Sequence, residues 1–237
     1  MSTQPASVRC TAPRTTLALL FVATCLCAGG GCSLVDENIR LTYAQPKTSS
    51  RPTAQLASAG RNAASNASAL SSAPVVEVAR PADPAIEKKE KGRSVIGNVR
   101  NTYGMVMASV VTADSLPNWF AESYARALTA AGYQAKVVDQ LSPGCPRGVE
   151  LEIRRLFVDQ DPGMLTVGSI ATLEYRMTLT KNGRKVQQID WTATGSGDRG
   201  LVQTGTTESA VRKAMRASLD RSIPYINAAL STNGATR

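Results

Sequence analysis

The fold of this chain is decided by residues 165–193, which read LTVGSIATLEYRMTLTKNGRKVQQIDWTA. Apolar and polar side chains alternate along the first half, as in a strand with one buried face. Asn182-Gly183 then predicts a type I′ turn, because both residue types tolerate positive φ angles. We therefore expect a β-hairpin. The inward positions of its first strand are Leu165, Val167, Ser169, Ala171, Leu173, Tyr175, Met177 and Leu179.

The apolar residues of the second strand set the register of this hairpin. A two-residue turn pairs Lys181 with Arg184, and the same register would place Met177 opposite Gln188 on the buried face. One spare residue at Gln187 restores apolar pairing, so we expect a β-bulge there. The bulge predicts three cross-strand pairs, which are Met177–Ile189, Tyr175–Trp191 and Leu173–Ala193.

Further strands are expected at 75–78, 95–99, 105–111, 134–139 and 149–158. In the last of these, the apolar positions change phase at Arg154-Arg155, which predicts a second β-bulge. A loop is expected at 87–93 and a turn at 159–163. The polar residues of the hairpin and its neighbouring strand share the face that we expect to contact water. They are Glu150, Glu152, Thr172, Glu174 and Arg176.

Two helices are expected, at 116–131 and 206–230. Asp114 and Ser115 can cap the N-terminus of the first helix, and Thr206 can cap the second. Gly132 follows the first helix as a C′ residue would. Pro224 should kink the second helix. Both helices carry apolar stripes, which we assign to the core rather than to a ligand surface. The stripes are Trp119, Phe120, Ser123, Tyr124, Ala127, Leu128 and Ala131, and Val211, Ala214, Met215, Ser218, Ser222, Ile223, Ile226 and Leu230.

The predicted fold class is therefore α+β, with two helices packed on one face of a mostly antiparallel sheet. The folded domain is expected at 75–231, followed by a flexible tail at 232–237. Residues 32–74 are dominated by small and polar side chains after position 42. Such a segment buries too little apolar surface to fold, so we expect a disordered tether at 32–74.

The first 31 residues have the features of a secretory signal peptide. Arg9 and Arg14 precede an apolar core, which is shorter than the roughly 20 residues that span a bilayer. Cys32 follows three glycines, an arrangement that resembles the lipobox of bacterial lipoproteins, in which the cysteine is acylated. Gly29 stands where that family usually has leucine, and ordinary secretion of a soluble product is the alternative. Cys25 and Cys27 are poorer sites.

Charge and cysteine content restrict the partners. The net charge of +9 could favour anionic lipid or glycan, and Arg212, Lys213, Arg216 and Arg221 form a basic face on the second helix. The positive residues are scattered, however, so a solvated surface is the favoured interpretation, and export argues against nucleic acid. Cys145 lies between prolines and glycine, which predicts an inert thiol in a turn.

The residues give no sign of an enzyme. The chain has no histidine, which removes the commonest general base and metal ligand. No cysteine cluster could hold a metal, and 194–198 lacks the pattern of a phosphate-binding loop. Glu150 and Glu152 could form the carboxylate pair of a glycosidase, but neighbouring charges favour a solvated face. We therefore predict no catalytic, cofactor-binding or metal-binding residues and no cofactor.

Several short segments together resemble a known family. They are Ile96-Gly97-Asn98-Val99-Arg100-Asn101, the helix end Ala131-Gly132-Tyr133, the strand at 149–153 and the Asn182-Gly183 hairpin, after a lipobox-like segment. Over 75–231 the chain resembles the YajG-like envelope lipoproteins and, more loosely, the ABC-transport auxiliary lipoproteins. The resemblance implies a lipid-anchored periplasmic domain with no known catalytic residues. Ser33 after the cysteine is compatible with outer-membrane sorting in such lipoproteins.

Two functions remain open on the sequence alone. The first is a non-enzymatic lipoprotein, held by Cys32 in the outer membrane and facing the periplasm, that binds another envelope protein within a transport or assembly complex. The second is a module that binds anionic lipid or glycan at the membrane surface.

Overall fold

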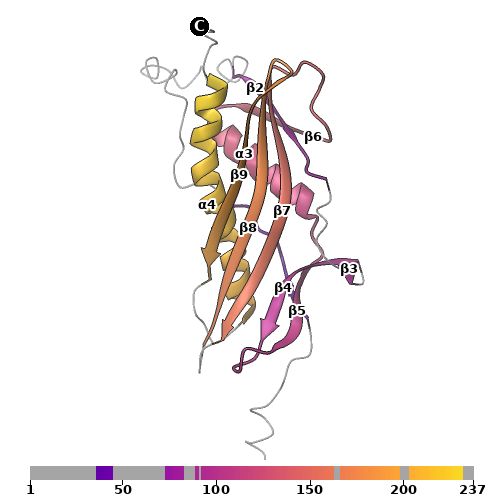
Figure 1. Cartoon of the computed structure of the whole chain (residues 1–237), viewed down its shortest axis with the longest axis vertical. Coiled ribbons are helices and arrows are strands. Elements are labelled where there is room, and N and C mark those ends of the chain that lie inside the picture. The colour runs from indigo at the N-terminus through magenta and orange to yellow at the C-terminus, as the bar shows by residue number, and fades with distance from the viewer. Residues whose placement is uncertain are drawn as a thin grey trace, which may run out of the picture. The chain divides into compact units, whose positions relative to one another are not determined.

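The computed structural model describes residues 36–44, 73–82, 89–90, 92–162, 166–197 and 203–231. The predicted signal peptide, Cys32, the segment 45–72 and the predicted tail at 232–237 lie outside these residues. The described residues contain one nine-stranded sheet and two helices, α3 and α4 (Figure 1).

Strands β8 (Val167–Lys181) and β9 (Arg184–Ser196) form the predicted hairpin. Asn182 and Gly183 have φ angles of 50° and 72°, as a type I′ turn requires. The three predicted apolar pairs are confirmed. Trp191 also packs against Tyr225 of α4, with ring centroids 6.0 Å apart, so the aromatic side of β9 faces the helix.

The β-bulge in β9 lies one residue earlier than predicted. Leu179 pairs with Gln187 and Thr180 with Lys185, so the spare residue is Val186 and the prediction of Gln187 is wrong. The first residues of β9 are exposed, and Val186 is 50% exposed, so no core contact holds it in register. A bulge at Val186 and a bulge at Gln187 restore the same apolar pairs. The alternation of apolar and polar residues therefore could not distinguish between these two positions.

β7 (Arg147–Pro162) is the central strand, and it pairs with β8 along its whole length. The register shift between Ile153 and Arg155 confirms the bulge predicted at Arg154-Arg155. The prediction of a turn at 159–163 is wrong in its start, because β7 and β8 stay paired as far as Pro162 opposite Val167. The other edge of β7 pairs with two strands, β2 (Val75–Ala79) and β4 (Arg93–Arg100).

The sheet is mixed, so the prediction that it is mostly antiparallel is not confirmed. Its order is β1-β5-β4-β7-β2-β6, with β8 and β9 on the other edge of β7 and β3 beside β4. Four pairings are parallel, namely β1–β5, β4–β7, β2–β7 and β2–β6, and four are antiparallel. The α+β class is confirmed. The parallel pairs were missed because they join strands that are distant in sequence, whereas alternation reports only a strand's own faces. The remaining strands are β1 (Glu37–Ile39), β3 (Lys89–Glu90), β5 (Val106–Thr112) and β6 (Gln134–Val138).

α3 (Leu116–Ala130) begins and ends as predicted. The Ser115 hydroxyl accepts a hydrogen bond from the Asn118 N–H at 3.4 Å, and Gly132 has a φ angle of 97°. α4 (Gln203–Ser231) begins before Thr206, so the prediction of Thr206 as its cap is wrong. The Thr206 hydroxyl instead lies 3.1 Å from the Ser169 hydroxyl of β8, within hydrogen-bond distance.

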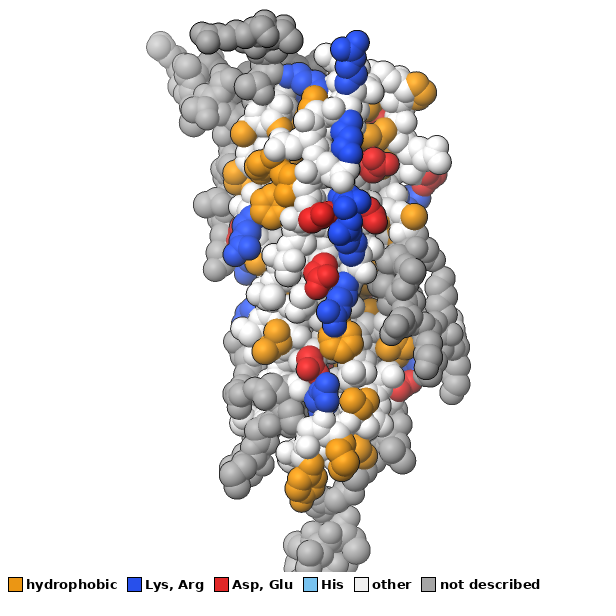
Figure 2. Space-filling model, viewed as in Figure 1, with side chains coloured by type: hydrophobic (Ala, Val, Ile, Leu, Met, Phe, Trp, Pro, Cys, Tyr) orange, Lys and Arg blue, Asp and Glu red, His pale blue; other side chains and the backbone are white. Residues whose placement is uncertain are grey.

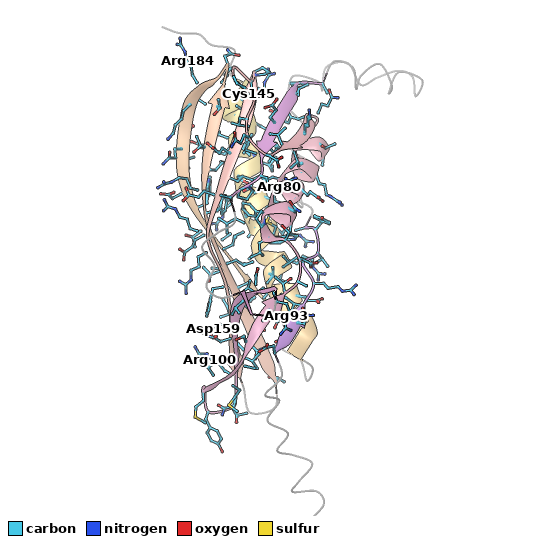
Figure 3. The ribbon with its side chains drawn as sticks, turned by 90° about the vertical axis from the view of Figure 1, so that its right-hand side faces the viewer. Arg80, Arg93, Arg100, Cys145, Asp159 and Arg184 are labelled. Carbon is cyan, nitrogen blue, oxygen red and sulfur yellow. The ribbon has the colours of Figure 1, made fainter. Side chains whose placement is uncertain are left out.

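Both helices lie on the same side of the sheet (Figures 1 and 3). A buried group of hydroxyls marks their meeting point. The hydroxyl of Tyr124 on α3 donates to that of Tyr175 on β8 at 2.8 Å, and it lies 3.0 and 2.9 Å from Ser218 and Ser222 on α4. Hydrogen bonding lets these polar groups occupy the core without a large desolvation cost. The apolar stripes predicted for both helices are buried.

The predicted tether is wrong at its N-terminal end. β1 lies within it and pairs in parallel with β5, with Glu37 opposite Val110. Ile39 is buried, and the indole N–H of Trp119 donates to the carbonyl of Thr42 at 3.0 Å. Residues 36–44 therefore belong to the folded domain. A three-residue strand whose partner is about 70 residues away leaves too little local pattern to be found from sequence.

The β8–β9 turn offers a first test of the fold. Gly183→Val should destabilise the protein by roughly 1–3 kcal/mol, because valine is strained at positive φ. Its Cβ would also lie 2.8 Å from the Cα of Gly144. Gly104→Val is the matched control, with a φ angle of 79° but no atom within 4 Å of the added Cβ. Urea unfolding should show the larger loss for Gly183→Val. Equal losses of unfolding free energy in the two variants would mean that the close approach to Gly144 adds nothing to the destabilisation.

A buried carboxyl in β1 should make stability depend on pH. Glu37 is only 8% exposed, and its Oε2 accepts from the Gln160 Nε2 at 2.6 Å. Burial raises the pKa of Glu37 above its ordinary 4.5, against hydrogen bonds from Thr207 and Gln160 that lower it. An acid whose folded pKa is raised destabilises the fold when ionised, and this cost appears as the pH rises from the unfolded pKa to the folded one.

Glu37→Gln should therefore raise the melting temperature near pH 7, and the gain should vanish at a pH below about 3.5, where both states are protonated. Glu150→Gln is the control, because the Glu150 side chain is exposed and makes no ion pair or hydrogen bond among the described residues. Melting curves across this pH range measure both effects. A gain that is independent of pH would show that ionisation of Glu37 is not the cause.

Candidate functional site

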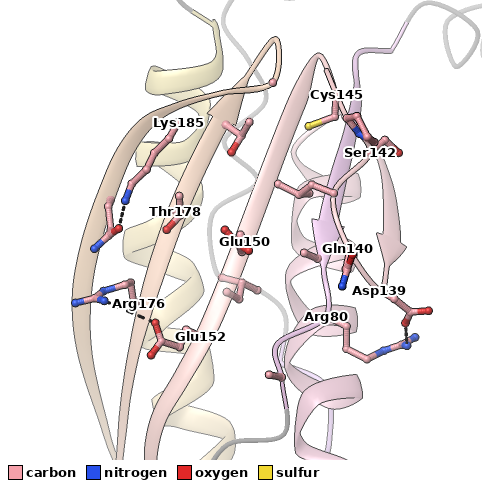
Figure 4. Close-up of a pocket in the computed structure, with 18 of the residues that line it drawn as sticks. Arg80, Asp139, Gln140, Ser142, Cys145, Glu150, Glu152, Arg176, Thr178 and Lys185 are labelled. Carbon is pink, nitrogen blue, oxygen red and sulfur yellow. Dashed lines mark hydrogen bonds and ion pairs between the residues drawn. The ribbon is translucent and has the colours of Figure 1, made fainter.

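A groove of 780 Å³ crosses the outer face of the sheet (Figure 4). Its floor is formed by outward side chains of β7, β8 and β9, and its wall by the loop between β6 and β7. Arg80 and Asp139 form an ion pair at one end. The floor residues are Glu150, Glu152, Arg176, Thr178, Thr180, Lys185 and Gln188, and the wall includes Gln140, Ser142, Gly144 and Cys145.

The floor is polar because alternate residues of these strands point away from the helices. This confirms the predicted wet face. Arg176 donates through Nε to the Asp190 carboxylate at 2.8 Å and lies 3.8 Å from Glu152. Arg154 also reaches both carboxylates, and Arg155 pairs with Glu174. These pairs form a stripe of alternating charge along the sheet (Figure 2).

The ion pairs shape the charge of the sheet's outer face more than they stabilise the fold, since exposed pairs contribute little free energy. The hydrogen bond from Arg176 lowers the pKa of Asp190, and the same bond raises that of Arg176. Both groups therefore stay charged at neutral pH. Because carboxylates neighbour the arginines, this face presents both signs of charge rather than a positive patch.

The wall of the groove is fastened on two sides. Glu77 of β2 accepts hydrogen bonds from the Ser142 N–H at 2.7 Å and from its hydroxyl at 2.8 Å. These bonds lower the pKa of Glu77. On the other side, the N–H groups of Asn182 and Gly183 donate to the carbonyls of Pro146 and Cys145. The wall is therefore tied to β2 and to the β8–β9 turn, so the groove is formed before any ligand binds.

Cys145 lies in the predicted turn, where its N–H donates to the Ser142 carbonyl at 3.0 Å. Its side chain is 3% exposed. Burial, and then the Glu77 carboxylate, raises the pKa of the Cys145 thiol above its ordinary 9.0. The thiol is protonated at neutral pH, which does not favour nucleophilic chemistry.

Other sequence predictions can also be placed. Arg212 and Arg221 of the predicted basic face on α4 are exposed, whereas Lys213 and Arg216 are half-buried. Among the described residues, no three His, Cys, Asp or Glu side chains gather closely enough to hold a metal ion. Within the described ranges, neither α3 nor α4 combines the length and the hydrophobicity that a bilayer span requires. Cys32, the predicted lipidation site, lies outside the described residues.

The groove itself was not predicted. Its floor follows from alternation, but its wall depends on how the loop at 139–146 folds back beside β2 and the β8–β9 turn. The only local indication was the turn sequence Pro143-Gly144-Cys145-Pro146. That sequence predicts a turn without saying which strands lie next to it.

Comparison with known proteins supports the fold. No family model and no curated protein sequence matches the chain, so the resemblance to the YajG-like family stays a prediction. A crystal structure of a Xanthomonas campestris protein described by the family model DUF330 superposes with a TM-score of 0.52 at 16% identity. The alignment covers 84% of this chain and 98% of that protein. At this identity, the similarity establishes a shared fold and no more.

The weaker structural similarities include proteins from Chlamydia trachomatis and Caulobacter crescentus. A hypothetical protein from Chlamydia trachomatis aligns with a TM-score of 0.40 and 13% identity, over 68% of this chain and 99% of its own. A Caulobacter crescentus protein described as a lipoprotein aligns with a TM-score of 0.28 and 14% identity, over 70% of this chain and 91% of its own. Neither similarity is strong enough to support a functional argument.

Proposed function

We propose that this protein is a non-enzymatic lipoprotein of the bacterial envelope, anchored through acylated Cys32, that binds another envelope protein. The anchor is supported by the basic start, the short apolar core and the three glycines directly before Cys32. Ser33 favours the outer membrane, with the domain facing the periplasm. The partner would belong to a transport or assembly complex.

The groove carries the binding part of this proposal. It is formed in advance, it is open to solvent, and it offers hydroxyls, amides and both signs of charge. Such a lining suits a polar protein segment, which presents backbone donors and acceptors together with mixed side chains. Glu150 and Thr180 are suited to direct contact, because neither has an ion pair or a side-chain hydrogen bond among the described residues.

Photocrosslinking in the cells that produce the protein tests this proposal. A photoreactive residue at Thr180, on the groove floor, should give a reproducible adduct with one envelope protein. The same residue at Ala130, exposed on α3, should give none. Adding Glu150→Arg to the Thr180 variant should weaken the adduct roughly tenfold, because it reverses an exposed charge in the groove. No adduct at Thr180, or equal adducts at both positions, would contradict groove binding.

The second candidate function is binding of anionic lipid or glycan by the basic face of α4. Its support is the exposure of Arg212 and Arg221 on that helix. This function predicts salt-sensitive binding of the Cys32→Ser chain, which would lack acyl chains, to anionic vesicles. Equal binding to neutral and anionic vesicles would exclude it.

A further inference from the structure

The β4–β5 hairpin ends in exposed apolar side chains. Tyr103 is 86% exposed, Met105 57% and Val106 54%. We call residues 103–106 the hairpin tip. Apolar residues gathered in this way at a protruding turn usually mark a contact surface, whereas single exposed residues elsewhere need no explanation.

The hairpin tip is held in place before it meets any partner. The Asn101 side-chain oxygen accepts from the N–H groups of Tyr103 and Met105 at 3.0 and 2.9 Å. Arg100 donates to the Gly104 carbonyl at 2.8 Å and to Asp159 at 2.7 Å. These bonds fix the turn, so presenting its apolar side chains requires little additional ordering.

The start of the folded chain lies beside this hairpin. β1 runs parallel to β5, so its N-terminal end points toward the hairpin tip. Asp36 accepts from the Ser109 N–H at 3.3 Å and from Arg93 at 3.1 Å. Ser109 is three residues beyond Val106, a separation of about 10 Å along a strand.

Covalent geometry then limits how far the lipid can be from the domain. Cys32 precedes Asp36 by four residues. Because an extended chain spans at most about 3.6 Å per residue, the two are no more than roughly 14 Å apart. A domain anchored at Cys32 therefore cannot stand far from the membrane, contrary to the expectation of a long tether. The segment 45–72 follows β1 and cannot act as a spacer between the lipid and the domain.

We infer that the hairpin tip contacts the phospholipid surface in which the Cys32 acyl chains are embedded, an inference that rests on the lipid anchor proposed above. The tip and the N-terminal end of β1 lie at the same end of the sheet, both within reach of that surface. Tyr103 suits the headgroup level, because its ring is apolar and its hydroxyl can remain hydrated. Met105 and Val106 would contact the outermost acyl carbons.

Fluorescence of the full-length lipoprotein in phospholipid vesicles tests this inference. Tyr103→Cys, in a Cys145→Ala background, would carry an environment-sensitive dye. The matched control is Val186→Cys in the same background, because Val186 is also an exposed apolar hairpin residue. Val186 lies near Arg184, at the end of the sheet opposite Arg100 (Figure 3). Flotation with the vesicles and a mass spectrum of Cys32 report the anchor independently.

Flotation with a shielded dye at position 103 is the expected result. The dye should show a blue-shifted emission and roughly twofold or stronger quenching by spin-labelled lipid, while the dye at position 186 stays in water. If the protein floats with the vesicles but the dyes at positions 103 and 186 both report an aqueous environment, the inference is overturned while the anchor stands. The hairpin tip would then be a candidate contact for a protein partner instead. Absence of flotation together with an unacylated Cys32 would overturn the anchor, and the inference with it.

Discussion

Gly195→Ala is expected to cost about 3 kcal/mol of folding free energy or more, at the upper end of what overpacking costs. Gly195 lies where β9 crosses α4 with no space for a side chain. An added Cβ would collide with the backbone nitrogen of Ala214 and the carbonyl oxygen of Ala210. Neither strand nor helix can yield easily, because Gly195 is paired with Ala171 of β8 and Ala214 is buried. The helix would have to move away from the sheet.

The matched control is Gly205→Ala, the same substitution within α4 itself. No atom lies within 4 Å of the Cβ that it would add. We expect it to be neutral or to stabilise the helix by up to about 1 kcal/mol. Urea unfolding followed by circular dichroism gives both values. Similar stabilities of the two variants would mean that β9 and α4 are not packed as described.

Cys32→Ser should abolish stable membrane association. The lipid is attached to the sulfur atom of the cysteine thiol, and a serine hydroxyl cannot replace that thiol in lipoprotein processing. The variant should accumulate as an uncleaved precursor or be released into the soluble fraction, whereas the wild type should remain with the membranes. Cell fractionation and immunoblotting measure the distribution.

Cys27→Ser provides the control for this variant, since Cys27 lies within the predicted signal peptide and should be removed with it. It should fractionate like the wild type. Membrane retention and normal processing of Cys32→Ser would contradict the anchor. So would loss of retention on replacing Cys27, which would point to a different attachment site.

The two proposed contact surfaces are compatible with each other. In Figure 3, Cys145 and Arg184 lie beside the groove at the turn end of the β8–β9 hairpin. Arg100, which precedes the hairpin tip of β4–β5, lies far from them at the opposite end of the sheet. With the tip against lipid, the groove would remain open to a partner in the periplasm. Lipid contact would then set the orientation of the domain, and the groove would set its specificity.

Elements governed by local chemistry were predictable from sequence. α3 was found from the spacing of its apolar residues and from Ser115 and Gly132 at its ends. The β8–β9 hairpin was found from alternation and Asn182-Gly183, and its register from the pairing of Tyr175 with Trp191.

Features that depend on distant pairing were not predictable. β1 contributes only three residues, and its partner strand begins at Val106. Nothing near β1 in the sequence indicates that pairing, so the segment was assigned to the tether. The parallel pairings of β2 and β4 with β7 were missed for the same reason. The groove and the hairpin tip became visible only once these strands were placed, because each is defined by neighbours far away in the sequence.

The mass of the mature N-terminal peptide tests the central claim most directly. The protein would be purified from membranes, digested, and analysed without removing lipid. We predict a peptide that begins at Cys32 and carries the added mass of acyl chains. An unmodified peptide that begins at any other residue, or at Cys32 with a free thiol, would contradict the claim that this protein is a lipid-anchored component of the envelope.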